Sequence, residues 1–433
     1  MSAVGKERPM EASAEPQGHD ERPAGVAEHA EVVVVGAGMV GAALACLLGQ
    51  AGVEVALVDA RESLLDHEAV GRGQPGMRVS ALTPVSQRLL ERLGAWEWMA
   101  ARRISPYRFM QVWDAEGSGE VSFSAEQAGV AKLGHIVEND VTQAALERRL
   151  VALPSVRLLL GARVTGLTDA EGGRCVHLAD GRRLVAPLVV AADGARSPLR
   201  ELAGIETRQR DTGHRAMVTT VKVARPHGEV ARQAFLPTGP LAFLPLRLNG
   251  ESDHCSIVWS TSPEEAERLL GLAPEALGEA LAAAIGHRLG EVTVVDRAVA
   301  FPLVQRHAER YVLPGLALVG DAAHSIHPLA GQGVNLGLMD AAVLAEELLA
   351  ARRRGAALGD ERVLARYARR RRGDNAGMLA LMDGFRLLFG ARHPALALAR
   401  NLGMGAVDRL TPLKRLLLQQ ATGHRGRLPR TCR

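Results

Sequence analysis

A mixed α/β (α+β) fold is predicted by three features of the 433-residue sequence. A run of valines leads into a glycine-rich turn, a helical pattern follows, and a second apolar strand closes the unit. The middle of the chain then returns to alternating strand patterns, and the C-terminal part reads mainly as helix. Because a chain of this length exceeds one ordinary core, we expect at least two domains.

The N-terminal unit has a βαβ pattern. "EVVVVGAG" predicts a buried strand entering a turn, "MVGAALACLLGQAG" a helix, and "VEVALVDAR" a second strand that ends at Asp59. The spacing Gly36-x-Gly38-x-x-Gly41 permits a tight turn, lets a pyrophosphate approach the backbone and lets the helix pack on the sheet. The helix N-terminus and Asp59 complete a Rossmann-like dinucleotide site, and the acid favours FAD or NAD over NADP.

The rest of the chain contains further helix and strand patterns. Helical patterns cover residues 83–101, 137–153, 262–286 and 335–354. Ser262 is expected to cap the third of these helices, and the C-terminal part is expected to form short helices broken at Pro394 and Pro412. Strands are expected around a turn at Asp180–Gly181 and again over about 213–260.

Composition narrows the class of protein. Hydrophobic residues make up 47% of the chain, enough for a packed interior, whereas 3% aromatic residues are too few for nucleic-acid stacking platforms. The four cysteines contain no CxxC pair, which is typical of free thiols in a reducing cytoplasm. The first thirty residues read as a disordered leader and lack the apolar segment of a signal peptide. We therefore expect a cytoplasmic protein.

Net charge is only +4, but two basic runs, "ARRRG" and "RYARRRRGD", lie late in the chain. Such runs are typical of solvated helix faces. They also fit docking on an anionic membrane surface or an acidic partner.

Two later strand-to-helix junctions carry glycine and aspartate. "LVVAADGARSPLR" places Asp193 and Gly194 after an apolar strand, a pattern that is also a common turn. "LALVGDAAHSIHPLAGQGVNLGLMDA" places Gly320 and Asp321 after another strand, where Asp321 alone also fits a helix cap.

In this order the three motifs resemble those of the para-hydroxybenzoate-hydroxylase-type (group A) flavoprotein monooxygenases, over about residues 31–350. The resemblance implies an FAD-binding domain assembled from distant parts of the chain. Asp321 would hydrogen-bond the ribityl chain, and Asp193 and Gly194 would lie near the pyrophosphate. Backbone N–H groups of "GQGVN" would face the flavin ring and stabilise negative charge on it. The residues expected at the cofactor from this last region are Gly320, Gly331, Gly333, Val334 and Asn335.

Three further positions carry over from the same resemblance. Arg78 in "GMRVSALTPVS" would contact the flavin or the phosphates, and a surface salt bridge is the other interpretation. Gln143 in "NDVTQAAL" would contact the flavin from a helix start, and Val164 would pack against the adenine. NAD(P)H or a separate reductase is expected as electron donor, and the sequence has no second dinucleotide fingerprint.

The chain also resembles a narrower branch, the ubiquinone-biosynthesis hydroxylases that oxidise polyprenylated phenols. "RVSALTPVS", "IVENDVTQAAL", "HPLAGQGVNLGLMDAAVLAEEL" and the tail "LMDGFRLLFGARHPALALARNLGMGAVDRLTPLKRLLLQQATG" carry this resemblance. The tail positions that match are Asp383, Phe389, Arg400, Gly403, Pro412, Leu413 and Lys414. The implied activity is that of an FAD-dependent monooxygenase that inserts one oxygen atom of O2 into an aromatic ring.

The catalytic base is not apparent, because the sequence offers no obvious acid–base pair or nucleophile. His324 and His327 lie on the loop expected near the flavin and are candidates for deprotonating a phenol. Packing or hydrogen bonding without catalysis is the alternative for both. No third ligand lies near them in the sequence, so we expect no metal site.

The expected domains are a leader over 1–30, a discontinuous FAD-binding domain over 31–103, 133–210 and 291–350, a substrate domain over 104–132 and 211–290, and a helical C-terminal region over 351–433. Apolar residues of the substrate domain fit either a prenyl-binding lining or an ordinary sheet core. These residues are Phe235, Leu241, Phe243, Leu244 and Leu246.

The expected partners are a lipid-tailed phenol and O2, with a ubiquinone-biosynthesis complex and the inner face of the membrane as further candidates, and no nucleic acid. Two alternatives stay open. One is a flavin monooxygenase of a soluble aromatic compound, which fits the three motifs equally well. The other is a non-catalytic FAD-binding scaffold subunit that docks through the basic tail.

Overall fold

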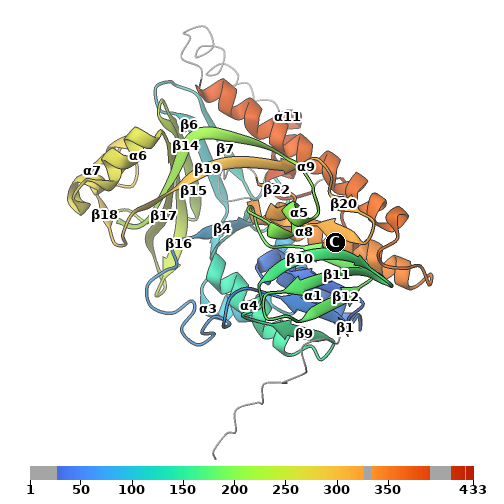
Figure 1. The fold of residues 1–433 in the computed structure, drawn as a ribbon. Coiled ribbons are helices and arrows are strands. Elements are labelled where there is room, and N and C mark those ends of the chain that lie inside the picture. Colours follow the sequence, from blue (N-terminus) through green and yellow to red (C-terminus); the bar gives the residue numbers. More distant parts are fainter. Residues whose placement is uncertain (1–26, 326–332, 391–410, 425) are drawn as a thin grey trace, which may run out of the picture.

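Four β-sheets and the helices packed on them form the described part of the chain (Figure 1). The computed structural model describes residues 27–325, 333–390, 411–424 and 426–433. The mixed α/β class predicted from the sequence is confirmed.

A six-stranded sheet forms the centre of the part of the molecule that contains the glycine fingerprint. Its order is β20-β21-β13-β2-β3-β9, and all neighbours from β21 to β9 pair in parallel. The strands are β2 (Val32–Val35), β3 (Val55–Val58), β9 (Val156–Leu159), β13 (Leu188–Ala191), β20 (Val312–Leu313) and β21 (Leu316–Leu318). Strands β2, β3, β13 and β21 are buried along their whole length, which explains their continuous apolar sequences. Helix α1 (Met39–Gln50) contacts both α4 (Asn139–Val151) and α8 (Gly333–Arg352) beside this sheet.

The motif-bearing turns leave this sheet at one edge. Strands β21, β13, β2 and β3 are consecutive parallel neighbours, so their carboxyl ends lie side by side. The turns that follow them contain Gly320, Asp193, Gly36 and Asp59, respectively. Ligands of parallel α/β sheets bind beyond the carboxyl ends of the strands. The topology therefore brings motifs that are far apart in the sequence to one place.

A four-stranded sheet of order β1-β12-β11-β10 adds buried side chains to the same core. Its strands are β1 (Ala27–His29), β10 (Val164–Ala170), β11 (Gly173–Leu178) and β12 (Arg183–Ala186). The predicted turn at Asp180–Gly181 joins β11 to β12, and Gly181 has the positive φ of 88° that such a turn needs. Strand β1 lies within residues 1–30, which were predicted to be a disordered leader. The prediction is wrong for Ala27–His29, because these residues pair in parallel with β12.

A nine-stranded sheet forms the second large layer. Its order is β22-β19-β14-β17-β16-β15-β6-β7, and β18 pairs with β14 off this path. The strands are β6 (Phe109–Asp114), β7 (Glu120–Ser124), β14 (Thr207–Val223), β15 (Val230–Leu236), β16 (Gly239–Leu248), β17 (Glu251–Thr261), β18 (Val292–Val294), β19 (Val299–Ala308) and β22 (His324–Ser325). Helices α6 (Pro263–Leu270) and α7 (Pro274–Ala284) lie at one end of the molecule in Figure 1, and their apolar side chains pack on one face of this sheet.

The opposite face of the nine-stranded sheet packs against a small sheet and the C-terminal helix. The small sheet has the order β4-β8-β5, with β4 (Val79–Leu82), β5 (Ser105–Tyr107) and β8 (Gly134–Glu138). Helix α11 (Thr411–Ala421) contributes Leu418 to the apolar cluster between these layers. The second layer therefore has two distinct apolar faces.

Two helices predicted as continuous are each divided in the structure. The segment expected as one helix over 83–101 forms α2 (Pro84–Arg92) and α3 (Trp96–Arg102), because Gly94 adopts a φ of 71° at the join. The segment over 262–286 forms α6 and α7, and the second of these begins at Pro274, where a missing N–H is tolerated. Ser262 caps α6 as predicted, since its hydroxyl oxygen accepts a backbone N–H of the first turn at 3.2 Å.

The C-terminal helices also differ from the expectation. Helix α9 (Glu361–Gly390) is one continuous helix of 30 residues, not a set of short pieces. Pro412 does not break a helix but lies in the first turn of α11, where proline is tolerated. Pro394 lies outside the described residues.

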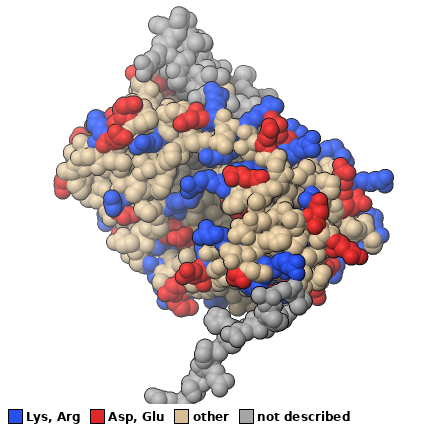
Figure 2. Space-filling model, in the orientation of Figure 1, with Lys and Arg blue, Asp and Glu red and all other residues tan. Residues whose placement is uncertain are grey.

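Part of the basic run on α9 serves packing between helices. Arg366 and Arg370 form ion pairs with Glu347 of α8 at 3.0 and 2.9 Å, and Arg371 is buried against Asp340 at 2.6 Å. Figure 2 shows basic and acidic side chains interspersed over the visible face. Helices long and apolar enough to cross a bilayer are absent from the described ranges.

Candidate cofactor and active site

The fingerprint turn between β2 and α1 is closely packed where glycine is required. Gly36 has a φ of 101°, and a Cβ atom there would lie 2.4 Å from the carbonyl oxygen of Ala192. A Cβ at Gly41 would lie 1.9 Å from the carbonyl oxygen of Gly36. At Gly38, by contrast, a Cβ would meet no protein atom within 4 Å. Gly36 and Gly41 are therefore required by packing within the chain, whereas Gly38 faces open space, as expected where a pyrophosphate approaches.

The N-terminus of α1 is suited to an anion. Its first turn contains no acidic residue, and Gly38 provides no side-chain cap for the first N–H groups. Those N–H groups and the helix dipole favour a phosphate at this position.

Asp59 at the end of β3 binds the fingerprint turn directly. Its Oδ2 accepts the N–H of Ala37 at 2.6 Å, and its Oδ1 accepts the backbone N–H and Nε of Arg61 at 2.8 and 3.1 Å. Arg61 also donates to the carbonyl oxygen of Ala37 at 3.1 Å and pairs with Glu147 at 2.9 Å. The structure thus places Asp59 beside the turn. Its contact with a ribose hydroxyl stays a prediction.

Gln143 and Glu147 of α4 support the same turn. The side-chain amide of Gln143 donates to the carbonyl oxygen of Ala37 at 2.7 Å and to Glu147 at 2.9 Å. Glu147 is fully buried and also accepts from Arg61. The sequence reasoning found Gln143 but missed Arg61 and Glu147. The signals available in the sequence were an arginine two residues after Asp59 and an acidic residue, Glu147, within the helical pattern of α4.

The Asp193–Gly194 turn lies against the fingerprint turn through Ala192. Asp193 Oδ2 accepts the N–H of Leu199 at 3.0 Å, whereas Oδ1 is buried with no hydrogen-bond partner among the described residues. Burial raises the pKa of Asp193, and hydrogen bonds from Ser197 and Leu199 oppose this effect. A buried acceptor without a partner is costly, so this atom is suited to accept a donor from a ligand.

The Gly320–Asp321 turn packs on α1 and α8. A Cβ at Gly320 would lie 3.2 Å from Val40 of α1, and a Cβ at Gly337 of α8 would lie 2.6 Å from the same side chain. The Asp321 side chain is exposed. Nearby protein groups still raise the pKa of Asp321 by desolvation, while His324 and Arg78 act to lower it. The charge of Arg78 thus acts on Asp321, so two of the predicted cofactor residues interact electrostatically.

Asn335 joins the start of α8 to the segment "RVSALTPVS". Its Oδ1 accepts the N–H of Thr83 at 3.0 Å and the hydroxyl of Ser86 at 2.7 Å, and its Nδ2 donates to the carbonyl oxygen of Ala81 at 2.8 Å. Two motifs that the sequence analysis treated separately are thus fixed to one another. These contacts of Asn335 hold two segments of the protein together.

The remaining predicted residues are placed as follows. Gly333 and Val334 form the first turn of α8, and Val164 begins β10 and packs at the margin of the dinucleotide-binding core. Gly331 and His327 lie outside the described residues. The roles of these residues at the cofactor stay predictions.

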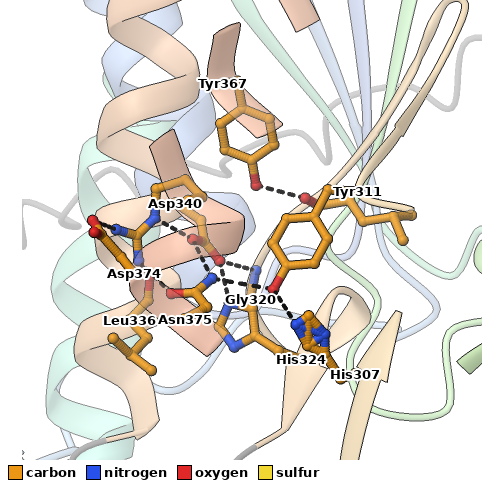
Figure 3. Close-up of polar contacts among 11 residues, drawn as sticks. His307, Tyr311, Gly320, His324, Leu336, Asp340, Tyr367, Asp374 and Asn375 are labelled. Atoms are coloured by element: carbon orange, nitrogen blue, oxygen red, sulfur yellow. Dashed lines mark hydrogen bonds and ion pairs between the residues drawn. The ribbon is translucent and has the colours of Figure 1, made fainter. Parts of the chain in front are cut away.

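His324 belongs to a buried polar network (Figure 3). Its Nε2 lies 2.6 Å from Oδ2 of Asp340, and Nε of Arg371 lies 2.6 Å from Oδ1 of the same carboxylate. Burial alone would raise the pKa of Asp340, but the charges and hydrogen bonds of His324 and Arg371 lower it to about 2. This engagement favours the hydrogen-bonding interpretation of His324. The sequence reasoning missed Asp340 and Arg371, although an aspartate within the apolar run "LMDAAVL" signals a buried partner.

The apolar residues predicted for the substrate domain divide between the two faces of the nine-stranded sheet. Leu241 and Phe243 pack in the cluster under α6 and α7. Leu244 and Leu246 face the opposite cluster, which also contains Ala81. Strand alternation produces this division. Because Ala81 also binds Asn335, the cluster with Leu244 borders the cofactor motifs.

One group of metal-type ligands lies elsewhere, on the nine-stranded sheet. Glu251, Asp253 and His254 offer ligand atoms within 4.8 Å of one another. The ammonium group of Lys222 lies 3.4 Å from Glu251 and 3.1 Å from Asp253. The simpler description of this group is a surface charge cluster in which Lys222 supplies the cation.

The described residues fit FAD. An uncapped helix N-terminus, an open position at Gly38, and a buried partnerless oxygen on Asp193 lie at one sheet edge. The exposed carboxylate of Asp321 follows the neighbouring strand β21. Such an arrangement can bind an extended dinucleotide through its phosphates and hydroxyl groups.

Comparison with known proteins gives the same picture. A family model described as "FAD binding domain" matches residues 29–380. The ubiquinone hydroxylase UbiL of Rhodospirillum rubrum is 41% identical over 394 residues, which cover 91% of this chain and 90% of that protein. The 3-demethoxyubiquinol 3-hydroxylase of Escherichia coli is 41% identical over 393 residues, which cover 91% of this chain and 98% of that protein. The structure of PqsL from Pseudomonas aeruginosa, described as a probable FAD-dependent monooxygenase, matches 88% of this chain and 100% of its own with a TM-score of 0.71 and 25% identity.

Proposed function

The chain belongs to the FAD-binding monooxygenase family, in its ubiquinone-biosynthesis branch, and from this premise we propose that it hydroxylates the ring of a polyprenylated phenol or quinol precursor of ubiquinone. The family predicted from the three motifs is confirmed. The protein is an FAD-dependent monooxygenase, so the interpretation as a non-catalytic scaffold subunit is set aside.

FAD, when bound and reduced, activates O2 and delivers one oxygen atom to the aromatic ring. The chain's own groups bind and orient the cofactor and substrate. In our proposal the first N–H groups of α1 bind the pyrophosphate, beside the buried Oδ1 of Asp193. The exposed carboxylate of Asp321 accepts hydrogen bonds from ribityl hydroxyl groups.

The start of α8 is the proposed support for the flavin ring. Gly333 and Val334 present backbone N–H groups at the N-terminus of a 20-residue helix, where the helix dipole favours negative charge. Asn335 fixes this helix start to Thr83 and Ser86, so the N–H groups are held in place before the cofactor binds.

One observation carries the assignment of a lipid-tailed substrate. Leu418 of α11 lies in the same apolar cluster as Leu244 and Leu246 of the sheet and Ala81 beside the cofactor motifs. The tail resembles the ubiquinone branch, and the presence of Leu418 in this cluster supports a path for the prenyl chain between the proposed flavin-ring region and α11. We propose that the prenyl chain runs from the flavin along this cluster towards α11.

The test is mass analysis of the quinone pool after deletion of the gene. A precursor that lacks one ring oxygen is expected to accumulate, and expression of the chain should restore the mature quinone. An unchanged quinone profile would contradict the assignment. The position of the missing oxygen identifies the ring carbon that this chain hydroxylates.

A soluble aromatic substrate is the alternative that the same protein preparation can test. Purified holoenzyme with an electron donor, either NAD(P)H or a separate reductase, is assayed on phenols that differ only in prenyl length. The proposal predicts a lower KM for the prenylated phenol, because each buried CH2 contributes about 0.8 kcal/mol. Equal KM values for short and long chains would favour a soluble substrate.

Contact with a membrane surface follows from the same proposal, since a prenylated substrate resides in the bilayer. Flotation of the holoenzyme with liposomes containing anionic lipid tests this contact, and neutral liposomes are the control. Copurification with other ubiquinone-biosynthesis proteins tests association with a biosynthetic complex.

A further inference from the structure

The two oxygens of the Asp340 carboxylate bind different parts of the molecule. Oδ2 accepts the N–H of Gly320 at 3.0 Å and lies 2.6 Å from Nε2 of His324, so it binds the turn that carries Asp321. Oδ1 lies 2.6 Å from Nε of Arg371 and accepts from Asn375 at 3.3 Å, so it binds α9. Figure 3 shows Asp340 with Gly320 and His324 on one side and Asn375 on the other. One buried side chain thus bridges the cofactor turn and a C-terminal helix.

Arg371 reaches a second part of the cofactor region. Besides its bond to Asp340, its guanidinium donates to the carbonyl oxygen of Leu336 at 3.4 Å and to Asn375 at 2.7 Å. Leu336 follows Asn335 directly at the start of α8. Arg371 therefore links α9 to the Gly320 turn through Asp340, and it binds directly to the helix start proposed to face the flavin ring.

The Gly320 turn and the first turns of α8 also pack closely against one another. A Cβ added at Gly337 would lie 3.2 Å from the Cα of Gly320 and 2.6 Å from Val40. Tyr367 of α9 donates its hydroxyl to the carbonyl oxygen of Leu318, in the strand that leads to Gly320. A shift of α9 therefore acts on the Gly320 turn from both of its ends.

The burial of this bridge makes it sensitive to the loss of one partner. Asp340, Arg371 and Asn375 are at most 2% exposed. A buried charge that loses its partner is strongly destabilised, unlike a surface ion pair, which contributes little. Removal of Arg371 should therefore leave the buried Asp340 carboxylate, directly behind the turn that presents Asp321, with His324 as its remaining charged partner.

We propose that Asp340 is a positioning residue that couples the docking of α9, through Arg371, to the retention of FAD. The inference rests on FAD as the cofactor and does not depend on the substrate proposed above. Coupling between two sites is reciprocal, so bound FAD stabilises the docked α9 as much as docked α9 stabilises bound FAD.

The experiment compares Arg371→Met with a matched control, Arg370→Met. Arg370 is the neighbouring residue on α9 and also pairs with α8, through Glu346 and Glu347, but it does not touch Asp340. FAD is titrated into cofactor-depleted protein by flavin fluorescence, and hydrogen exchange of residues 361–378 is measured with and without FAD. Denaturant unfolding of each cofactor-depleted variant records its stability separately.

The expected result is specific to Arg371. The Kd for FAD should rise by about 5- to 150-fold in Arg371→Met, the usual range for coupled sites, and by less than about threefold in Arg370→Met. FAD should slow hydrogen exchange in α9 of the wild type and of Arg370→Met, but not of Arg371→Met. Arg371→Lys, which keeps the cation, should recover part of the FAD affinity.

Three results would overturn the proposal. The first is an unchanged Kd for FAD in Arg371→Met. The second is a loss of FAD affinity that is equal in both variants once their unfolding free energies are matched, which would mean that α9 docking has only a general structural role. The third result concerns the wild type and applies even if Arg371→Met fails to fold. If FAD does not change hydrogen exchange in α9 of the wild type, the coupling does not exist. None of these measurements uses a substrate, so failure here is distinct from failure of the proposed hydroxylation.

Discussion

Two glycines of the fingerprint turn should give opposite results when each is replaced by alanine. At Gly36 the backbone φ is 101°, and a Cβ would lie 2.4 Å from the carbonyl oxygen of Ala192. A strained φ costs about 1–3 kcal/mol, and overpacking against backbone adds about 1–3 kcal/mol. Gly36→Ala should therefore lower the unfolding free energy of the cofactor-depleted protein by about 2–6 kcal/mol.

At Gly38 the same change should leave the cofactor-depleted protein nearly intact. Its φ of −64° suits alanine, and a Cβ meets no protein atom within 4 Å. The N-cap preference for glycine over alanine sets a cost of at most about 1 kcal/mol. The added methyl group instead occupies the open position assigned to the pyrophosphate. The FAD affinity of Gly38→Ala should therefore fall by at least about tenfold, or 1.4 kcal/mol.

Two measurements test this pair. Denaturant unfolding followed by circular dichroism gives the stability of the cofactor-depleted proteins, and flavin fluorescence gives the FAD affinity. The reasoning is refuted if Gly38→Ala binds FAD as tightly as the wild type. It is equally refuted if Gly38→Ala unfolds as early as Gly36→Ala, because both positions would then be required by the protein and not by the ligand.

Three further changes test other parts of the site. Asp193→Asn should weaken FAD binding in fluorescence titrations, because an amide oxygen accepts a hydroxyl group of the cofactor less strongly than a carboxylate oxygen does, and an unchanged Kd would remove Asp193 from the site. The pKa of Asp340 is lowered to about 2, so its contribution to stability is present above pH 4 and is lost as the pH falls towards 2. Asp340→Asn should abolish about 2 kcal/mol of that acid-dependent loss in denaturant titrations, and the same pH slope in both proteins would contradict the assignment. Leu418→Ala should raise KM for a long-chain prenylated phenol and leave KM for a short-chain phenol unchanged, whereas equal effects on both would place the prenyl chain elsewhere.

The sequence predicted those parts of the fold that depend on local patterns. The valine run of β2, the Gly36 turn and the alternation in the nine-stranded sheet each follow from neighbouring residues. The join at Gly94 and the division at Pro274 were missed because the apolar helical pattern continues across both positions. In each case a single residue with special backbone preferences outweighs the pattern.

The candidate site was predicted to the extent that its residues belong to motifs. Asp321, Asp193 and Asn335 were identified in this way, but their protein contacts were not. Asn335 was expected near the flavin, and the structure shows it bound to Thr83, a partner far away in the sequence. The pair of Asp340 and Arg371 joins helices α8 and α9. Such a pair could not be predicted, because a local sequence pattern does not determine the distance or the orientation between two helices.

Convergence of the three motifs has a simple topological cause that also explains why α9 matters. Strands β21, β13 and β2 are adjacent and parallel, so the turns after them must share one edge of the sheet. In the turn after β2, the N–H of Ala37 donates to Asp59 at the end of the neighbouring strand β3. In the turn after β13, Asp193 accepts the N–H of Leu199, which lies only a few residues along the chain. In the turn after β21, by contrast, the N–H of Gly320 donates to Asp340 on α8, and Asp340 is itself bound by Arg371 on α9. Of these three turns, the one that carries Asp321 is thus the one whose geometry depends on the C-terminal region.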